Sequence, residues 1–211
     1  MEIWICAYRE WALEIHNQVK EEIKCNLITS KEQFNKIKFN KNDIIFFLGW
    51  SWIISDDIIQ KYKCICLHPS PLPKYRGGSP IQHQIINGEN LSAVTFFRMT
   101  DELDAGTILY SEYFSLKGNL KNIFSRIIPL GTSGIFHILT SNMEEQTQDE
   151  SQATFYKRRK PEDSEILIED FKKHTAKELY NKIRALQDPY PNAYIKCKDK
   201  KLFIQTSQYE K

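Results

Sequence analysis

A histidine at the start of a proline-rich loop is the residue of this chain best suited to move a proton. His68 follows the apolar run 64–67 and precedes Pro69, Pro71 and Pro73. Each proline fixes its own φ angle and favours an extended conformation for the residue before it, so the loop is stiff. Imidazole changes its charge near neutral pH, which makes His68 a candidate general acid or base. The alternative is a structural histidine that bonds a backbone carbonyl.

A carboxylate further along the chain is the natural partner of this histidine. Asp104 is followed by Ala105 and Gly106, two small residues that let the backbone approach a ligand closely. Because His68 and Asp104 each follow a predicted strand of a parallel sheet, we expect their side chains to converge at one crevice. The carboxylate would orient the imidazole and stabilise the imidazolium. Taken alone, Asp104 also fits a turn or cap residue.

Short apolar runs alternate with amphipathic or polar intervals, which predicts a parallel sheet covered by helices. The predicted strands are 3–7, 26–29, 44–48, 64–67, 91–99 and 107–114, and the predicted helices are 11–19, 56–62, 79–86 and 119–139. Pro129 and Gly131 are expected to interrupt the last helix. The fold class is therefore α/β, with a Rossmann-like, mostly parallel sheet flanked by helices.

The composition changes near residue 141, where a polar segment rich in Glu, Gln and Ser predicts a linker over 141–153. We therefore expect one domain over 1–150 and a small C-terminal extension over 151–211. The extension is predicted to contain a helix at 175–186 and a hairpin formed by 193–196 and 202–206.

The charge balance argues against partners that are bound mainly by charge. The chain has 29 basic and 27 acidic residues, so no strong field attracts nucleic acid or a membrane, although the basic run 157–160 can contact an anion. The five cysteines lie mostly in apolar runs, which favours reduced thiols and a cytoplasmic location. The sequence shows no basic leader and no uninterrupted apolar segment of membrane-spanning length, so no membrane partner is expected.

Open α/β sheets bind ligands beyond the carboxyl ends of their strands, and four such ends carry polar or aromatic residues here. They are 8–10, 49–52, 68–70 and 101–104. The sequence lacks a glycine-rich dinucleotide fingerprint, a P-loop and a His-x-x-x-His metal motif. At the first of these ends, Arg9 either binds a phosphate with both guanidinium nitrogens or is a solvated surface arginine.

Three sequence blocks together resemble the folate-dependent formyltransferase family. The first is His-Pro-Ser-Pro-Leu-Pro-Lys-Tyr-Arg-Gly at 68–77, and the second is Asp-Ala-Gly-Thr-Ile-Leu at 104–109. The third consists of 158–164, 183–186 and 188–193, and it is similar to the segment after the catalytic domain in the tRNA and sugar branches of the family.

The resemblance implies transfer of a formyl group from N10-formyltetrahydrofolate to a primary amine, without a metal ion. His68 would stabilise the tetrahedral intermediate and assist proton movement, while Asp104 would orient His68 and help to relay the proton. The candidate residues for the folate cofactor are Gly49, Trp50, Ser51, Trp52, Ile53 and Asp101, and those for the acceptor are Tyr8, Arg9, Gln82 and Tyr190. Either tryptophan can instead pack in the core, and Gln82 can instead lie on the surface.

One position departs from the family pattern. The family usually carries an asparagine two residues before the histidine, where its amide donates to the formyl oxygen, and here that position is Cys66. A thiol is a weak donor, and loss of one preorganised donor costs about 3 kcal/mol in other enzymes. Three explanations of this departure are open: another group donates to the formyl oxygen, the enzyme is slow, or the chain has lost activity. We expect activity to be retained, with Cys66 a buried strand residue rather than a nucleophile.

Length and charge favour the sugar branch of the family. The tRNA branch carries a sizeable domain that holds nucleic acid, whereas this sequence ends soon after 189–191 and is nearly neutral. The expected acceptor is the amine of a nucleotide-linked amino sugar for bacterial surface glycans. The alternatives are a non-catalytic folate or nucleotide-sugar binding protein, or a formyltransferase for another small amine or an aminoacyl acceptor. Apolar residues of the terminal hairpin can pair two copies into a homodimer.

Overall fold

A mixed six-stranded sheet forms the centre of the protein. The computed structural model describes residues 1–141 and 145–210. In the order of the sheet the strands are β2 (Asn26–Ile28), β1 (Ile3–Ala7), β3 (Ile44–Leu48), β4 (Lys63–His68), β6 (Leu91–Arg98) and β7 (Ile108–Ser115). The pairings from β2 to β4 are parallel, whereas β6 runs antiparallel to both β4 and β7. The predicted α/β class with a mostly parallel sheet is confirmed.

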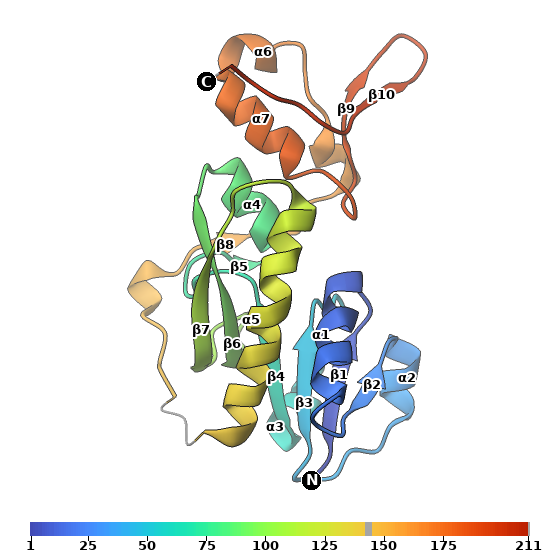
Figure 1. Cartoon of the computed structure of the whole chain (residues 1–211), viewed down its shortest axis with the longest axis vertical. Coiled ribbons are helices and arrows are strands. Elements are labelled where there is room, and N and C mark those ends of the chain that lie inside the picture. Colours follow the sequence, from blue (N-terminus) through green and yellow to red (C-terminus); the bar gives the residue numbers. More distant parts are fainter. Residues whose placement is uncertain (142–144, 211) are drawn as a thin grey trace.

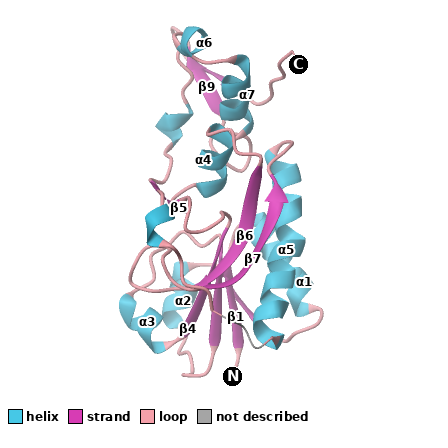
Figure 2. Cartoon of the chain, turned by 90° about the vertical axis from the view of Figure 1, so that its left-hand side faces the viewer, coloured by secondary structure: helices cyan, strands magenta, loops and turns pink. Residues whose placement is uncertain are grey.

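Helices cover both faces of this sheet, as the view along its edge shows (Figure 2). The helices are α1 (Glu10–Lys20), α2 (Lys31–Lys36), α3 (Asp56–Lys61), α4 (Pro80–Ile86), α5 (Leu120–Thr140), α6 (Asp170–Lys173) and α7 (Ala176–Arg184). Phe46 of β3 packs in the layer under α1 and α5, and the next residue, Phe47, packs in the opposite layer with residues of α2 and α3. The central strand β3 is therefore buried on both faces, and the carboxyl ends of the strands are left for a ligand.

Pro129 and Gly131 do not interrupt α5, contrary to the expectation from sequence. Pro129 is exposed, so the hydrogen bond that it removes is lost on the solvent side. A Cβ atom at Gly131 would lie 2.5 Å from Cδ1 of Ile15, so glycine lets α5 approach α1. By length and composition alone, α5 could cross a membrane, which the sequence analysis did not predict. Its buried residues pack against α1 and the sheet.

The C-terminal segment lies beyond α4, at the end of the molecule opposite the N-terminus (Figure 1). Helix α7 contacts α4, and an antiparallel hairpin of β9 (Ala193–Lys196) and β10 (Lys201–Ile204) packs on a small apolar cluster that includes Ile166 and Ile183. A parallel pair, β5 (Arg76–Gly77) and β8 (Phe155–Tyr156), joins this segment to the loop after His68.

The predicted linker packs against the domain instead of crossing solvent. Its residues 142–144 lie outside the described part of the chain. Further along, Gln146 forms a β-bridge with Ile108, and Gln148 is only 5% exposed. Polar composition therefore did not indicate a linker, because Gln146 bonds to the domain through its backbone and Gln148 through its side chain.

Candidate active site

A cleft of about 1090 Å³ opens at the carboxyl ends of β1, β3 and β4. Each of the four strand-end segments singled out by the sequence contributes to its lining. The lining segments are 49–54, 66–69, 77–82, 99–104, 155–160 and 189–191, joined by single residues such as Arg9, Trp11 and Phe124.

His68 ends β4 and is 6% exposed. Its Nε2 atom lies 2.8 Å from the carbonyl oxygen of Tyr75. Because a carbonyl oxygen only accepts, Nε2 carries the hydrogen atom, and Nδ1 of the neutral ring has a free lone pair. Nδ1 lies 3.6 Å from Oδ2 of Asp104. The histidine does bond a backbone carbonyl, and that bond leaves Nδ1 as the nitrogen that can accept a proton.

Asp104 reaches His68 through the loop between β6 and β7. Since β6 is antiparallel to β4, with Arg98 opposite Ile65, its carboxyl end lies away from that of β4. The expectation that both residues follow parallel strands is therefore wrong, although their side chains do meet. The loop folds back tightly, because Asp104 has a φ of 52° and a Cβ atom at Gly106 would lie 1.7 Å from the carbonyl oxygen of Arg98.

Two hydrogen bonds from Gln148 hold the Asp104 loop in place. The side-chain amide of Gln148 donates to the carbonyl oxygens of Asp104 and Gly106 at 2.9 and 2.7 Å. Oε1 of Gln148 accepts from Arg76, which is 1% exposed and also pairs with Glu150. Sequence patterns gave no signal for Gln148, since a glutamine in a polar segment resembles any solvated residue.

Cys66 lies two residues before His68, so both side chains project from the same face of the sheet. Its thiol lines the cleft and lies 3.7 Å from the carbonyl oxygen of Leu67, a weak contact. Burial, reinforced by the Asp104 carboxylate, raises the pKa of the Cys66 thiol well above its usual value. A neutral thiol is a poor nucleophile, so Cys66 is not suited to attack a substrate. A thiol is also only a weak hydrogen-bond donor beside the histidine.

The segment after β3 forms an aromatic wall of the cleft. Gly49 has a φ of 58° and turns the chain, and the rings of Trp50 and Trp52 pack edge to face at 4.7 Å. Ile53 stands at the rim and is 94% exposed. The indole N–H groups of Trp11 and Trp50 are buried without an acceptor among the described residues. Trp11 was not singled out by sequence, because one tryptophan in an amphipathic helix usually indicates core packing.

A basic corner, formed by Arg9 and residues 157–160, adjoins this wall. Arg9 and Arg158 both donate to Oγ of Ser51, at 3.4 and 3.3 Å, and the Tyr8 hydroxyl bonds the same atom. Within the described residues neither of these arginines forms an ion pair. Tyr8 stands behind the lining residues, with its ring 4.8 Å from that of Trp52. The corner can therefore accept an anion.

Gln82, Asp101 and Tyr190 also line the cleft. Gln82 is 3% exposed, which excludes the alternative of a surface glutamine. The ring of Tyr190 lies 6.2 Å from that of Phe124, and burial raises the pKa of its hydroxyl. Every candidate residue except Tyr8 thus faces one cleft. Within 1–141 and 145–210, no group of three or more His, Cys, Asp or Glu side chains is placed to hold a metal ion.

Two family models match the chain. The formyl transferase model covers residues 14–120, and the model of the formyl transferase C-terminal domain covers residues 159–211. The chain belongs to the formyl transferase family. Methionyl-tRNA formyltransferase of Thermotoga maritima is 35% identical to this chain over 189 residues, which are 85% of this chain and 59% of the relative. The chain therefore spans about three-fifths of that relative's length.

Solved structures share the fold of this member of the family. Methionyl-tRNA formyltransferase from Clostridium thermocellum has a TM-score of 0.89 and 29% identity, covering 100% of this chain and 94% of that one. WlaRD, a sugar 3N-formyl transferase solved in the presence of dTDP and 5-N-formyl-THF, has a TM-score of 0.67 and 19% identity, covering 88% and 78%. The names of these proteins include a tRNA and a sugar, so the shared fold does not choose the acceptor.

Proposed function

We propose that this formyl transferase moves a formyl group from N10-formyltetrahydrofolate to a primary amine, with His68 as the proton acceptor. The observation that carries the proposal is the placement of Nδ1, which lies 3.6 Å from the Asp104 carboxylate in a large cleft while Nε2 is bonded to Tyr75. No other ring nitrogen in the described cleft lining has this arrangement.

The site meets the proton requirements of amide formation. When the amine nitrogen attacks the formyl carbon, the nitrogen must lose a proton and the formyl oxygen gains negative charge. Nδ1 of His68 accepts that proton, and the Asp104 carboxylate then stabilises the imidazolium. When the tetrahedral intermediate collapses, the bond between the formyl carbon and N10 breaks and N10 takes the proton from His68, so tetrahydrofolate leaves as a neutral amine. Gly77 and Gln148 hold Asp104 before the reaction, so little reorganisation is needed.

The aromatic wall fits the formyl donor. N10-formyltetrahydrofolate supplies the formyl carbon, and its pterin ring is flat and rich in hydrogen-bond acceptors. Trp50 and Trp52 offer flat apolar surface, and the buried indole N–H groups of Trp11 and Trp50 need acceptors. We therefore place the donor against residues 49–53, with Asp101 at the rim.

The basic corner favours an acceptor that carries phosphate. Arg9 and Arg158 converge on Oγ of Ser51, and two guanidinium groups this close together suit a diphosphate. The net charge of +2 supplies little long-range attraction for a nucleic acid. Our proposed acceptor is therefore a nucleotide-linked amino sugar, with Tyr190 beside the base and Gln82 facing the amine.

Methionyl-tRNA is the second candidate acceptor. Two methionyl-tRNA formyltransferases favour it, one through 35% sequence identity and one through a TM-score of 0.89. The same basic corner would then hold the terminal phosphates of the tRNA.

One assay separates these functions. Purified protein is incubated with N10-formyltetrahydrofolate and with UDP-linked amino sugars, dTDP-linked amino sugars or methionyl-tRNA, and products are read by mass spectrometry. A formylated sugar supports the first candidate, and formyl-methionyl-tRNA alone selects the second. No transfer to any amine, together with tight folate binding, would leave a non-catalytic binding protein.

We also propose that two copies pair through the hairpin of β9 and β10. Leu202 and Phe203 are each 58% exposed on this hairpin, which leaves apolar surface on a short two-stranded sheet. Sedimentation should give the mass of a dimer, and Phe203→Lys should give a monomer. A monomeric wild-type protein at high concentration would refute the pairing.

A further inference from the structure

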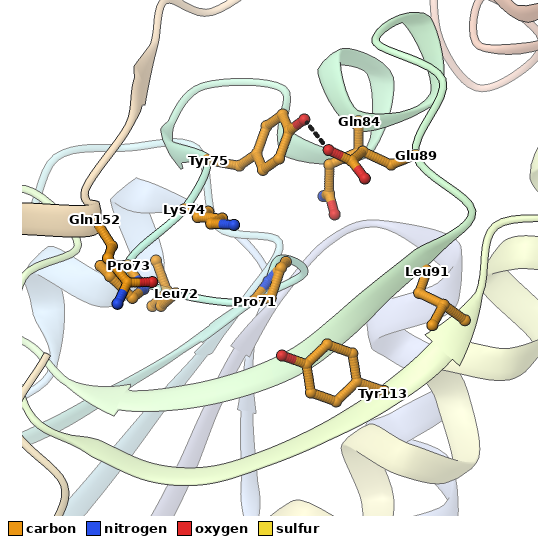
Figure 3. Close-up of a pocket in the computed structure, with 10 residues that line it drawn as sticks. All are labelled: Pro71, Leu72, Pro73, Lys74, Tyr75, Gln84, Glu89, Leu91, Tyr113 and Gln152. Atoms are coloured by element: carbon orange, nitrogen blue, oxygen red, sulfur yellow. Dashed lines mark hydrogen bonds between the residues drawn. The ribbon is translucent and has the colours of Figure 1, made fainter. Parts of the chain in front are cut away.

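A second pocket lies on the other side of the loop that follows His68 (Figure 3). Its volume is about 300 Å³, and it shares no lining residue with the cleft. The loop residues Pro71 to Tyr75 form one wall, Gln84 and Glu89 form a second, and Leu91 and Tyr113 of the sheet form a third. The pocket is therefore separate from the candidate active site, although the same loop borders both.

The side chain of Gln84 brings an unpaired acceptor to this pocket. Gln84 is fully buried, and its Nε2 donates to the carbonyl oxygens of Pro69 and Pro80 at 2.9 and 3.1 Å. These two bonds fix the orientation of the amide, and Figure 3 shows its oxygen beside its nitrogen at the end of the side chain, among the residues that line the pocket. Oε1 has no donor among the described residues. A buried carbonyl without a donor is destabilising, and a ligand with an N–H group would satisfy it.

The carboxylate of Glu89 adds negative charge on the same side as Gln84. Its Oε1 accepts from the hydroxyl of Tyr75 at 2.8 Å, the bond drawn in Figure 3, and this leaves its second oxygen for a ligand. Lys74 is also in the wall, but it forms no ion pair with Glu89 in the described structure. The pocket thus presents two acceptors, one of them charged.

The opposite walls are apolar and partly open to solvent. Leu91 is 56% exposed and Tyr113 is 64% exposed, and Pro71 lies beside them. An aromatic ring and aliphatic carbons suit a short hydrocarbon chain, and the ring face also attracts a cation.

We propose that this pocket binds a small primary ammonium ion with a short alkyl body. The ammonium group donates to Oε1 of Gln84 and to the free carboxylate oxygen of Glu89, while the alkyl chain packs on Leu91 and Tyr113. Such a ligand would contact the stretch of loop that fixes His68, because the carbonyl oxygen of Tyr75 bonds Nε2 of His68 at 2.8 Å. Occupancy of the pocket would therefore stabilise the loop conformation.

A titration of the full chain with n-butylammonium, followed by amide NMR, tests the proposal. We expect saturable shifts at Gln84, Glu89 and Tyr113, with a dissociation constant on the order of 1 mM for so small a ligand. The neutral isostere n-butanol should bind at least about tenfold more weakly, since it lacks the charge-assisted hydrogen bonds.

Matched variants make the result specific. Glu89→Gln retains an acceptor for the Tyr75 hydroxyl but removes the charge, so it should weaken n-butylammonium binding about tenfold. Glu112→Gln removes an exposed carboxylate of β7 that does not line the pocket, and it should leave the affinity unchanged. Absent binding, equal binding of n-butanol, or an unchanged affinity in Glu89→Gln would each overturn the proposal. The titration contains neither folate nor acceptor, so its failure is independent of formyl transfer.

Discussion

The backbone N–H of Gly77 donates to Oδ2 of Asp104 at 2.8 Å, and the same oxygen lies 3.6 Å from Nδ1 of His68. Gly77 belongs to the loop whose Tyr75 carbonyl oxygen accepts from His68. Histidine, loop and aspartate thus form a closed ring of contacts, and a shift of the loop must disturb both reacting groups together.

Replacement of either member of the pair should abolish most of the transfer. His68→Gln removes the proton acceptor, and Asp104→Asn removes the charge that stabilises the imidazolium, so we expect kcat to fall about a hundredfold to ten-thousandfold. Single-turnover formylation measures the effect, and circular dichroism should show an unchanged fold. His137→Gln, a change of an exposed histidine on α5, is the control and should retain activity. Full activity in Asp104→Asn would disprove the assignment.

Gln148 should act on the reaction without touching either substrate. Gln148→Glu keeps an acceptor for Arg76 but removes the amide that donates to the Asp104 loop, so we expect kcat to fall at least about tenfold while KM changes little. Steady-state kinetics separates the two constants. Gln146→Glu makes the same change at an exposed neighbour and should behave as wild type. A loss confined to KM would mean that Gln148 contacts a substrate instead.

Cys66 limits the stabilisation of the formyl oxygen if the proposed chemistry holds. Cys66→Asn places an amide donor on the same face of β4 as His68, and we expect kcat to rise at least about tenfold. An unchanged rate would show that another group already donates to this oxygen.

Because burial raises the pKa of the thiol, Cys66 should also resist iodoacetamide at pH 8, while the exposed Cys197 reacts. Peptide mapping by mass spectrometry would reveal preferential alkylation of Cys66, the contrary outcome.

Local patterns in the sequence were enough to place His68 in the site, because a strand end and a proline-rich loop are adjacent in the chain. The position of Asp104 was harder to derive. An apolar run such as β6 has the same composition in either direction, so its antiparallel pairing with β4 was not visible. The contact instead depends on the fold-back at Gly106.

Tertiary contacts decided the features that sequence patterns did not predict. Gln148 and Arg76 are a polar pair distant in the chain, and both are buried because hydrogen bonds to each other and to neighbouring groups satisfy them. Gln82 resembled a surface residue because the helical pattern gives a face but not what covers it. Gly131 resembled a helix breaker, whereas it is a contact point between α5 and α1.

The basic corner should govern affinity for a phosphate-bearing acceptor. Arg158→Gln removes one of two guanidinium groups at Ser51, so we expect KM for the acceptor to rise about tenfold with little change in kcat. Added salt should weaken the wild type more than the variant, since fewer charges remain to be screened. Lys198→Gln, on the exposed hairpin connection, is the charge-matched control. An unchanged KM in Arg158→Gln would place the phosphates elsewhere.

Tyr75 should make the protein sensitive to alkali. Burial, with a further effect of Glu89, raises the pKa of the Tyr75 hydroxyl to about 12, against about 10 in an unfolded chain. Below pH 10 both states keep the proton and this contribution to stability is complete. As the pH rises from 10 toward 12, only the unfolded state releases the proton, so the free energy of unfolding falls.

Tyr75→Phe should be less stable than the wild type by about 1 kcal/mol at pH 8, because a hydrogen bond to Glu89 is lost. Between pH 10 and 11.5 the variant should lose less stability than the wild type, because it has no hydroxyl to ionise. Urea unfolding at several pH values measures both effects, with Tyr113→Phe as an exposed control that keeps the wild-type slope. Parallel stability curves for wild type and Tyr75→Phe would show that Tyr75 is not the group responsible.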